Sequence, residues 1–413
     1  MKSIVSGIIA TIIAILCLGS LAAAKKREYP EPPPYVNPVE GEFPLCATYI
    51  YYKDAPVTRQ DLLRIKECGF NIMRASAHEP RFKQTLDSLE GIDLKTVSYI
   101  WEALGTDTER VVNRFKDNPH IVLYHIYDEP NTSQYPDVKK LCDRFNSIDS
   151  TRMTFVNLLA KTDPKQLQAP DYATYVDAFV QTVNPPFLSF DIYPVWSSRN
   201  KAYVAEDGLY SSYGTISRIS RESKRPFWAY ILTTKHWNYP KPKTEYIRFQ
   251  VFVALGYGAQ GLSFFTYALP DFDRKDHKFS DSALDEEGNP TDVWYMIRDV
   301  NREVTNLKDV FLGAEVVDVS HTGSKLPPDT KRLGTPPAPF NSIESGKQGI
   351  MVSHLRNGDN EYLLLLNRSV TEKQKVHYSL SAPVTRLTGD GKEKREKGSS
   401  VTLSPGGYAL YRL

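Results

Sequence analysis

The stretch Ile121-Val-Leu-Tyr-His-Ile-Tyr-Asp-Glu-Pro-Asn131 is the part of the chain that decides the fold. Its apolar, partly β-branched run predicts a buried parallel strand, which stops at two adjacent carboxylates followed by Pro130. Burying charge at the end of a strand costs free energy unless the charge is paired or used. In barrels of parallel strands, the carboxyl ends of the strands form the floor of the active site. Asp128 and Glu129 are therefore candidates for acid–base chemistry, and the competing role for Asp128 is a helix cap or a loop salt bridge.

Strand and helix signals alternate on both sides of this stretch. Strands are expected at residues 45–52, 70–77, 94–100, 121–127, 153–159, 187–193, 227–232 and 261–267. Amphipathic helices are expected near residues 58–67, 81–89, 106–116, 135–147, 171–183, 205–222, 243–255 and 291–307. Eight strands, each followed by a helix, predict an α/β fold of the (β/α)8 TIM-barrel type. The alternative is a doubly wound open sheet, but no glycine-rich phosphate turn follows the first strand.

The pattern changes beyond residue 310. Short alternating or β-branched runs follow, separated by turn signals such as Asn357-Gly358 and Asp390-Gly391, and they lie at residues 349–355, 362–366, 375–380, 400–403 and 408–413. They predict a small antiparallel β-sandwich. The expected domains are thus a barrel over residues 44–310 and a C-terminal β-sandwich over residues 311–413.

The N-terminal residues have the pattern of a secretory signal. Lys2 supplies positive charge, residues 4–16 are apolar, and Ala22-Ala23-Ala24 offers a cleavage site of small residues. Residues 1–24 are therefore expected to be a signal peptide, which implies a secreted or periplasmic protein without stable membrane insertion after cleavage. A retained signal anchor is the alternative. Residues 25–43 form a Pro-rich lead-in, a tether or a strap over the domain surface.

Composition excludes several functions. The formal net charge of +2 comes from scattered Lys and Arg, so no basic stripe indicates a nucleic-acid partner. Aromatic residues make up 12% of the chain, with 25 Tyr, which suits stacking on flat polar ligands such as sugars. Cys46, Cys68 and Cys142 form neither a disulfide framework nor a zinc pattern, so buried packing is expected. No pair of His has metal-ligand spacing, and neither a metal nor a cofactor is expected.

Alternation along the strands predicts which side chains point into the barrel. In the sixth strand Asp191 alternates with apolar residues, so Asp191 is expected inside, at the carboxyl end. In the fourth strand His125, Tyr127 and Glu129 share a face, and an inward Glu129 is expected. A bulge would invert this parity. The alternative role of Asp191 is that of a structural partner of Arg74.

Aromatic and polar residues follow most of the other strands. Aromatic residues at six of eight strand ends, joined by carboxylates, are typical of platforms that stack on pyranose rings. The substrate-binding candidates are Tyr51, Arg74, His78, Trp101, Tyr193, Trp196, Trp237 and Tyr267.

Three strand ends and the terminal sandwich together resemble clan A glycoside hydrolases. The fourth strand ends in acid–Glu–Pro, the sixth reads Ser189-Phe-Asp-Ile-Tyr-Pro194, and the eighth reads Gly261-Leu-Ser-Phe-Phe-Thr-Tyr267. The resemblance covers roughly residues 44–413. It implies a hydrolase with a carbohydrate substrate, with Glu129 as general acid/base and Asp128 where the clan usually has Asn. The clan's nucleophile, a second Glu at the end of strand seven, has no counterpart in residues 226–234.

Two mechanisms are compatible with the absence of the strand-seven Glu. The Asp128-Glu129 pair is also similar to substrate-assisted β-hexosaminidases, which implies that Asp128 orients a 2-acetamido group while Glu129 protonates the leaving group. Alternatively Glu129 serves an inverting enzyme, and another acid activates water, with Asp191, Glu79, Asp271 and Asp273 as candidates. In either case Glu129 must stay protonated near neutrality, and the like charge of Asp128 would raise its pKa. The competing functions are a non-catalytic carbohydrate-binding barrel and a metal-using hydrolase.

Overall fold

A computed structural model describes residues 28–51, 57–77, 81–100, 108–270 and 277–413 of the chain. Eight parallel strands close into a barrel in the order β1-β10-β9-β6-β5-β4-β3-β2. The strands are β1 (Leu45–Ala47), β2 (Ile72–Ser76), β3 (Lys95–Tyr99), β4 (Ile121–Asp128), β5 (Met153–Leu158), β6 (Leu188–Asp191), β9 (Phe227–Leu232) and β10 (Gly261–Phe265). Closure of the sheet confirms the predicted TIM barrel, and the open doubly wound sheet is wrong.

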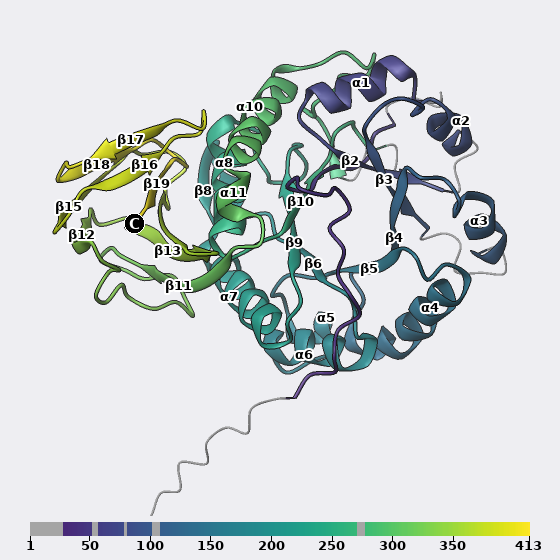
Figure 1. Cartoon of the computed structure of the whole chain (residues 1–413), viewed down its shortest axis with the longest axis horizontal. Helices are drawn as coiled ribbons and strands as arrows, with labels where there is room; N and C mark the ends of the chain where they lie inside the picture. The colour runs from purple at the N-terminus through teal and green to yellow at the C-terminus, as the bar shows by residue number, and fades with distance from the viewer. Residues whose placement is uncertain (1–27, 52–56, 78–80, 101–107, 271–276) are drawn as a thin grey trace, which may run out of the picture.

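Helices surround the barrel (Figure 1). Eight of them follow the barrel strands at the expected places: α1 (Arg59–Glu67), α2 (Phe82–Asp87), α3 (Thr108–Phe115), α4 (Tyr135–Ile148), α6 (Tyr172–Val183), α7 (Glu206–Glu222), α8 (Thr244–Gly256) and α10 (Asp292–Asn306). Side-chain caps set the starts of some of these helices: Thr58 and Asp61 form a capping box on α1, and Asp171 accepts from Thr174 N on α6. In the described residues, three short helical turns were not expected: η2 (Thr132–Gln134), α5 (Pro164–Leu167) and α11 (Lys308–Phe311).

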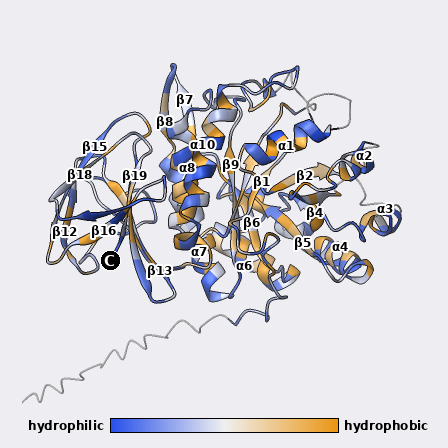
Figure 2. Cartoon of the chain, turned by 45° about the horizontal axis from the view of Figure 1, so that its top comes forward, coloured by the Kyte–Doolittle hydropathy of each residue, from blue (hydrophilic) through white to orange (hydrophobic). Residues whose placement is uncertain are grey.

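A two-stranded hairpin follows β6, formed by β7 (Val195–Ser198) and β8 (Lys201–Val204). Arg199 and Asn200 at its tip have positive φ values of 48° and 62°, as a tight hairpin turn requires. The hairpin was not predicted, because its strands are short and its turn lacks glycine. In Figure 2 it projects from the barrel.

The barrel interior is a packed core of its own. Inward side chains of the barrel strands form one buried cluster, together with Val39 of the lead-in and Phe187 just before β6. The members of this cluster are Val39, Cys46, Ile72, Val97, Leu123, Phe155, Phe187 and Trp228. The helix-facing side chains of the same strands belong to a larger cluster between the sheet and its helices. The interior is thus filled with side chains, as TIM barrels require.

The Pro-rich lead-in closes the N-terminal end of the barrel. It runs across the middle of the barrel in Figure 1, in dark purple. Tyr35 packs edge-on against Phe187, with ring centroids 5.7 Å apart, and its hydroxyl accepts from Trp228 Nε1 at 3.1 Å. Arg225 Nη2 donates to the carbonyl of Pro30 at 3.0 Å. Of the two predicted roles for this segment, these contacts match the strap.

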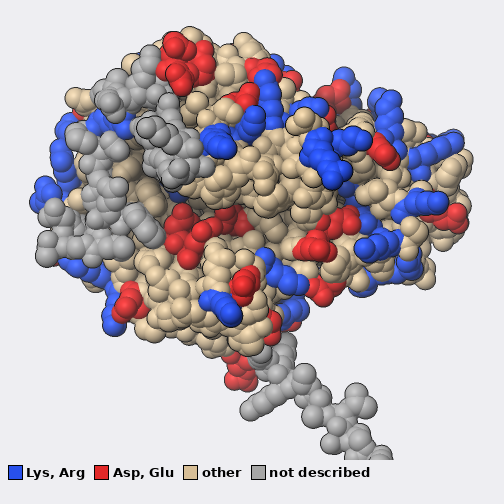
Figure 3. Space-filling model, turned by 180° about the vertical axis from the view of Figure 1, so that it is seen from behind, with Lys and Arg blue, Asp and Glu red and all other residues tan. Residues whose placement is uncertain are grey.

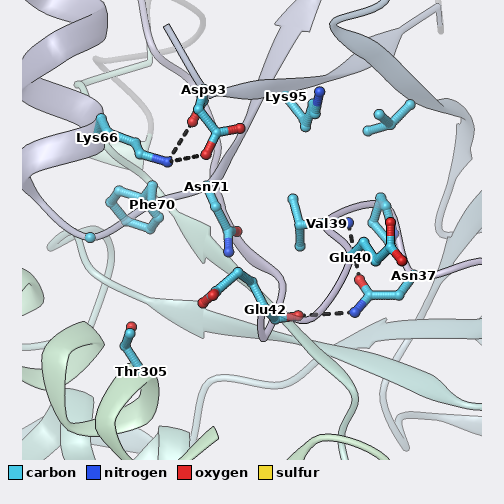
Figure 4. A pocket seen from close by; sticks show the side chains of 13 residues that line it. Asn37, Val39, Glu40, Glu42, Lys66, Phe70, Asn71, Asp93, Lys95 and Thr305 are labelled. Carbon is cyan, nitrogen blue, oxygen red and sulfur yellow. Dashed lines mark hydrogen bonds and ion pairs between the residues drawn. The ribbon is translucent and has the colours of Figure 1, made fainter.

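A hollow of about 750 Å³ lies beside the strap at this N-terminal end. Figure 4 shows its charged side chains, and several of them pair with neighbours. Lys66 Nζ lies 3.0 Å from Asp93 Oδ2, and Lys308 Nζ lies 2.6 Å from Glu42 Oε1. Because the N-terminal face of a TIM barrel serves stability, we assign both pairs to stability, and the pair Lys308–Glu42 holds the strap.

The C-terminal residues form the predicted β-sandwich. One sheet has the order β11-β13-β14-β19-β16-β17 and the other the order β12-β15-β18. Their strands are β11 (Glu315–His321), β12 (Phe340–Ser345), β13 (Ile350–Asn357), β14 (Asn360–Asn367), β15 (Gln374–Leu380), β16 (Val384–Leu387), β17 (Glu393–Glu396), β18 (Ser400–Leu403) and β19 (Tyr408–Arg412). Four of them, β11, β12, β16 and β17, were not predicted. The larger sheet packs on α8, where the Tyr408 ring stacks on Phe252.

Two smaller observations complete the fold. Cys46, Cys68 and Cys142 are free and buried, as expected. Within the described ranges, none of the helices is both long enough and apolar enough to span a bilayer.

Candidate active site

A bulge near the end of β4 decides which acidic side chain enters the barrel. The pairing of β4 with β5 shifts register between His125 and Tyr127. His125 lies inside the barrel, stacked on Phe155, whereas the Tyr127 hydroxyl accepts from Gln134 Nε2 at 2.8 Å on the outer side. The expectation that His125 and Tyr127 share a face is therefore wrong, because the extra residue of a bulge inverts the parity. As a result, Asp128 points inward.

Glu129 follows the bulge in an unusual backbone conformation. Its φ is +51°, a left-handed value that costs free energy for a residue with a side chain. Two hydrogen bonds hold this turn: the Glu129 N–H donates to the carbonyl of Asn157 at 2.8 Å, and the Tyr175 hydroxyl donates to the carbonyl of Pro130 at 2.7 Å. The Glu129 carboxyl is thereby directed to Asp191, with which it hydrogen-bonds.

Asp191 ends β6 and lies on the inward side of the barrel. One amide joins it to Asp128, since Asn157 Nδ2 donates to Asp191 Oδ1 at 3.1 Å and to Asp128 Oδ1 at 3.2 Å. The Tyr193 hydroxyl also bonds to Asp191. Three carboxyl groups from two strand ends therefore converge on one point of the C-terminal face, where Figure 3 shows acidic side chains in a hollow.

The crowding of these carboxyls changes their ionisation. Partial desolvation, followed by the charge of Asp128, raises the pKa of Glu129 to about 7, although its side chain remains open to solvent. Burial, followed by the charges of Glu129 and Asp128, raises the pKa of Asp191 well above its usual range. Burial also raises the pKa of Asp128, against the lowering effect of Arg74 and Asn157. Glu129 and Asp191 therefore titrate as a pair that holds a proton near neutrality.

Arg74 lies beneath this group rather than at the surface. Its guanidinium is 4.7 Å from the ring centroids of both Tyr49 and Tyr99, and Nη1 is 2.9 Å from His125 Nδ1. Because arginine only donates, His125 Nδ1 accepts, and Nε2–H donates to the carbonyl of Tyr127 at 2.9 Å. The expected substrate contact of Arg74 is not what the structure shows, since the side chain is buried. Its charge acts on Asp128 from below.

Aromatic side chains stand on one side of the acidic group. Trp237 is 55% exposed, and its ring lies 4.6 Å from that of His277. Trp196 packs on Tyr239 at 4.8 Å and donates from Nε1 to the carbonyl of Tyr193 at 3.0 Å. Tyr203, which pairs with Trp196 across the β7–β8 hairpin, is 47% exposed. Sequence reasoning missed Tyr203 because it missed the hairpin.

The remaining predicted substrate contacts are placed differently. Tyr267 lies in the core, where its hydroxyl accepts from Trp294 Nε1 at 3.2 Å, so the expected surface position is wrong. Tyr51 is half-buried beneath the guanidinium of Arg81, 4.1 Å from the ring centroid. The other predicted residues, His78, Trp101, Glu79, Asp271 and Asp273, lie outside the described residues.

Strand β9 contributes no carboxylate to the site. The residue in register with Asp191 is Tyr230, which is buried. Asn157, the residue that joins the acids, was not predicted either, because an Asn near the end of an apolar strand carries no distinctive signal. Within the described parts of the chain, no group of His, Cys, Asp and Glu has a geometry that could hold a metal ion.

No protein-family model matches the chain, and no curated protein matches it in sequence. Among solved structures it is similar to an endo-beta-1,4-mannanase from Thermotoga petrophila, with 11% identity over 87% of this chain and 97% of that one and a TM-score of 0.44. It is also similar to an alpha-L-arabinofuranosidase from Thermotoga maritima, with 12% identity over 92% and 97% of the two chains and a TM-score of 0.45. At these identities and TM-scores the neighbours assign no activity to this chain. Any function therefore has to rest on its own site.

Proposed function

We propose that the chain is a glycoside hydrolase that cleaves O-glycosidic bonds of a poly- or oligosaccharide, with Glu129 as the general acid. The observation that carries the proposal is the state of Glu129: a carboxyl at the C-terminal mouth of a TIM barrel, hydrogen-bonded to Asp191, with its pKa raised to about 7. A general acid works best when its pKa lies near the working pH. Glu129 can therefore hold a proton at neutrality and deliver it to a glycosidic oxygen.

The neighbouring acids suit the charge that this reaction develops. When Glu129 protonates the leaving oxygen, positive charge grows at the anomeric carbon and ring oxygen. Asp128 and Asp191 are fixed beside Glu129 by the amide of Asn157, so their charge needs no rearrangement during the reaction. Trp237 and Trp196 offer flat rings on which sugars could stack.

The contact between Glu129 and Asp191 bears on the second step. An inverting enzyme needs about 6.5–9.5 Å between its two carboxyls to admit water, and a hydrogen-bonded pair is much closer. Strand β9 offers no acid as a nucleophile. Both observations support substrate-assisted catalysis, in which the oxygen of a 2-acetamido group attacks the anomeric carbon. In this route Asp128 orients that group, and the bond to the leaving oxygen breaks as Glu129 gives up its proton.

The first prediction tests Glu129 as the acid. Glu129→Gln keeps the shape of the side chain but removes the transferable proton, so kcat/KM on 4-nitrophenyl glycosides should fall by about 10²–10⁴-fold. The loss should be far smaller on 2,4-dinitrophenyl glycosides, whose leaving group needs little protonation. The panel should include 2-acetamido and 2-hydroxy sugars, and proton NMR should record the anomer released first. Equal losses on both leaving groups would contradict the role of Glu129.

The stereochemistry of the product separates the mechanisms. If the anomeric configuration is retained on 2-acetamido sugars alone, the assisted route is supported. If it is retained on 2-hydroxy sugars as well, Asp191 is indicated as a nucleophile. Inversion would contradict the assisted route. Activity that survives EDTA would exclude a metal-using hydrolase.

The second candidate function is a non-catalytic carbohydrate-binding barrel, favoured by the absence of an acid on β9. In that case no substrate in the panel would be cleaved, and titration calorimetry would give the same sugar affinity for the wild type and Glu129→Gln. We also propose that the protein is exported, on the basis of residues 1–24. Cell fractionation with mass spectrometry of the mature N-terminus tests this.

A further inference from the structure

Asn157 touches all three acidic residues of the site. Its side-chain Nδ2 donates to Asp128 Oδ1 and Asp191 Oδ1, and its main-chain carbonyl accepts from the N–H of Glu129. The side chain is 3% exposed and belongs to β5, the strand between the two that carry the acids. In register it is the cross-strand neighbour of Asp128 on one side and of Ser189 on the other.

The orientation of the Asn157 amide follows from its partners. Ser189 Oγ donates to Asn157 Oδ1 at 2.9 Å, which leaves the nitrogen end to face the two carboxyls. An ionised carboxylate only accepts hydrogen bonds, so the amide N–H groups pair with the charged forms of Asp128 and Asp191. Neither N–H of this amide is directed at Glu129. The arrangement therefore stabilises the charged forms of Asp128 and Asp191 against the burial that raises the pKa of both.

We propose that Asn157 is a positioning residue that fixes Asp128, Asp191 and the backbone of Glu129 together and stabilises the charged forms of the two Asp side chains. This inference rests on the proposed function for its catalytic consequence, but its effect on the carboxyls does not. Because both N–H groups of one amide are engaged, Asp128 and Asp191 cannot reorient independently. Replacing Asn157 frees both at once.

The test follows the carboxyls directly in the full chain. Carboxyl carbon-13 NMR titrations of wild type, Asn157→Leu and Ser189→Ala would be compared, with signals assigned from Asp128→Asn, Asp191→Asn and Glu129→Gln. In Asn157→Leu the titration midpoint of Asp191 should rise by about one pH unit, because its charged form loses a donor. The midpoint of Asp128 should rise as well, because its charged form loses the same donor. Ser189→Ala, which only loosens the amide, should shift both in the same directions by less.

Asn301→Leu is the matched control. Asn301 is also buried, and its Nδ2 donates to the carbonyl of Cys68 at 3.0 Å, away from the acids. It should lower the melting temperature without moving any of the three midpoints. If Asn157→Leu titrates like this control, the proposal is overturned. If Asn157→Leu does not fold, Ser189→Ala decides, and unchanged midpoints there overturn the proposal.

Kinetics then separate this proposal from the proposed function. With an active wild type, Asn157→Leu should lower kcat by about 100-fold with little change in KM, as misplacement of catalytic groups does. A wild type that cleaves no glycoside but shows the carboxyl shifts would remove the glycosidase assignment and keep Asn157 as the positioning residue.

Discussion

At the scale of single residues, the ionisation of Glu129 is controlled by its surroundings. Its pKa is raised first by desolvation and then by the charge of Asp128, while the hydrogen bond to Asp191 works in the opposite direction. A carboxyl of this kind keeps its proton at a pH where an ordinary Glu has lost it. The chemistry therefore depends on neighbours that do not themselves transfer the proton.

The second prediction concerns the pH profile of Asp128→Asn. Glu129 must be protonated to act, so kcat/KM should fall as the pH rises through about 7. Removing the charge of Asp128 lowers the pKa of Glu129, so in the variant this fall should begin at lower pH. Steady-state rates between pH 4 and 9 would show the shift. Asp143→Asn, an exposed acid on α4, is the control and should leave the profile unchanged. An unshifted profile in Asp128→Asn would contradict the electrostatic role.

The sequence predicted which acids lie at the strand ends, but not the parity at the bulge or how deeply the neighbouring side chains are buried. The abrupt ends of two apolar strands were enough to bring Asp128, Glu129 and Asp191 to one mouth. Alternation cannot predict a bulge, so the parity of Tyr127 came out wrong. Nor can it tell how far a side chain lies below the surface, and for that reason Arg74 and Tyr267 were assigned to the substrate although both are buried.

At the scale of elements, the β7–β8 hairpin and the segment after β9 build the aromatic side of the mouth. Trp237 has a positive φ of 43°, and its N–H donates to the carbonyl of His277 at 2.9 Å. Because this hydrogen bond fixes the backbone while Trp237 stays 55% exposed, its ring is a surface available to a flat ligand. These elements, rather than the barrel strands, would set which sugars bind.

The third prediction is that Trp237→Ala weakens substrate binding more than it slows the chemical step. Loss of a stacking surface worth about 1 kcal/mol should raise KM about fivefold and leave kcat within about twofold. Initial rates on an oligosaccharide substrate measure both. Tyr295→Ala removes a ring of similar exposure, 49%, from α10 and serves as the control. A KM unchanged by Trp237→Ala would mean that no sugar stacks there.

The predictability of elements follows the strength of their patterns. All eight major helices lie close to their expected ranges because their amphipathic runs are long, and three of the runs also begin at the capping residues Thr58, Asp171 and Thr291. The strands that were missed have weaker patterns. β17 reads Glu-Lys-Arg-Glu and is largely exposed, and β16 has only four residues. Charged edge strands lack the apolar alternation on which strand prediction depends.

At the scale of the whole molecule, each end of the barrel has a separate task. The C-terminal end holds the acids, and the N-terminal end is closed by the strap and its paired charges. The sandwich packs beside the barrel on α8, where Ser353 Oγ donates to the carbonyl of Gly256 at 2.6 Å. Substitutions at the N-terminal end should therefore change stability without changing the chemistry.

The fourth prediction tests this division at Tyr35. Tyr35→Ala removes the ring that packs on Phe187 and covers Trp228, so the free energy of unfolding should fall by about 2 kcal/mol, less than for a fully buried aromatic. Tyr35→Phe, which loses only the hydrogen bond to Trp228, should cost about 1 kcal/mol. Urea unfolding measures both, and kcat of the folded variants should match the wild type. Val36→Ala, at a 65% exposed neighbour, is the control, and an equal midpoint for Tyr35→Ala would contradict the strap's role.

The position of the strap also determines where a support or a label can be attached without covering the carboxyls. The strap ends at Glu28 beside α6 in the outer ring of helices, where Gln181 Nε2 donates to the Glu28 carbonyl at 2.9 Å. A resin, a fluorophore or a fused partner joined ahead of Glu28 would be attached beside α6 and not at the mouth that holds the three carboxyls. Immobilisation through that end should therefore preserve access for long polysaccharide chains, whereas coupling through the hairpin tip at Lys201 would obstruct it.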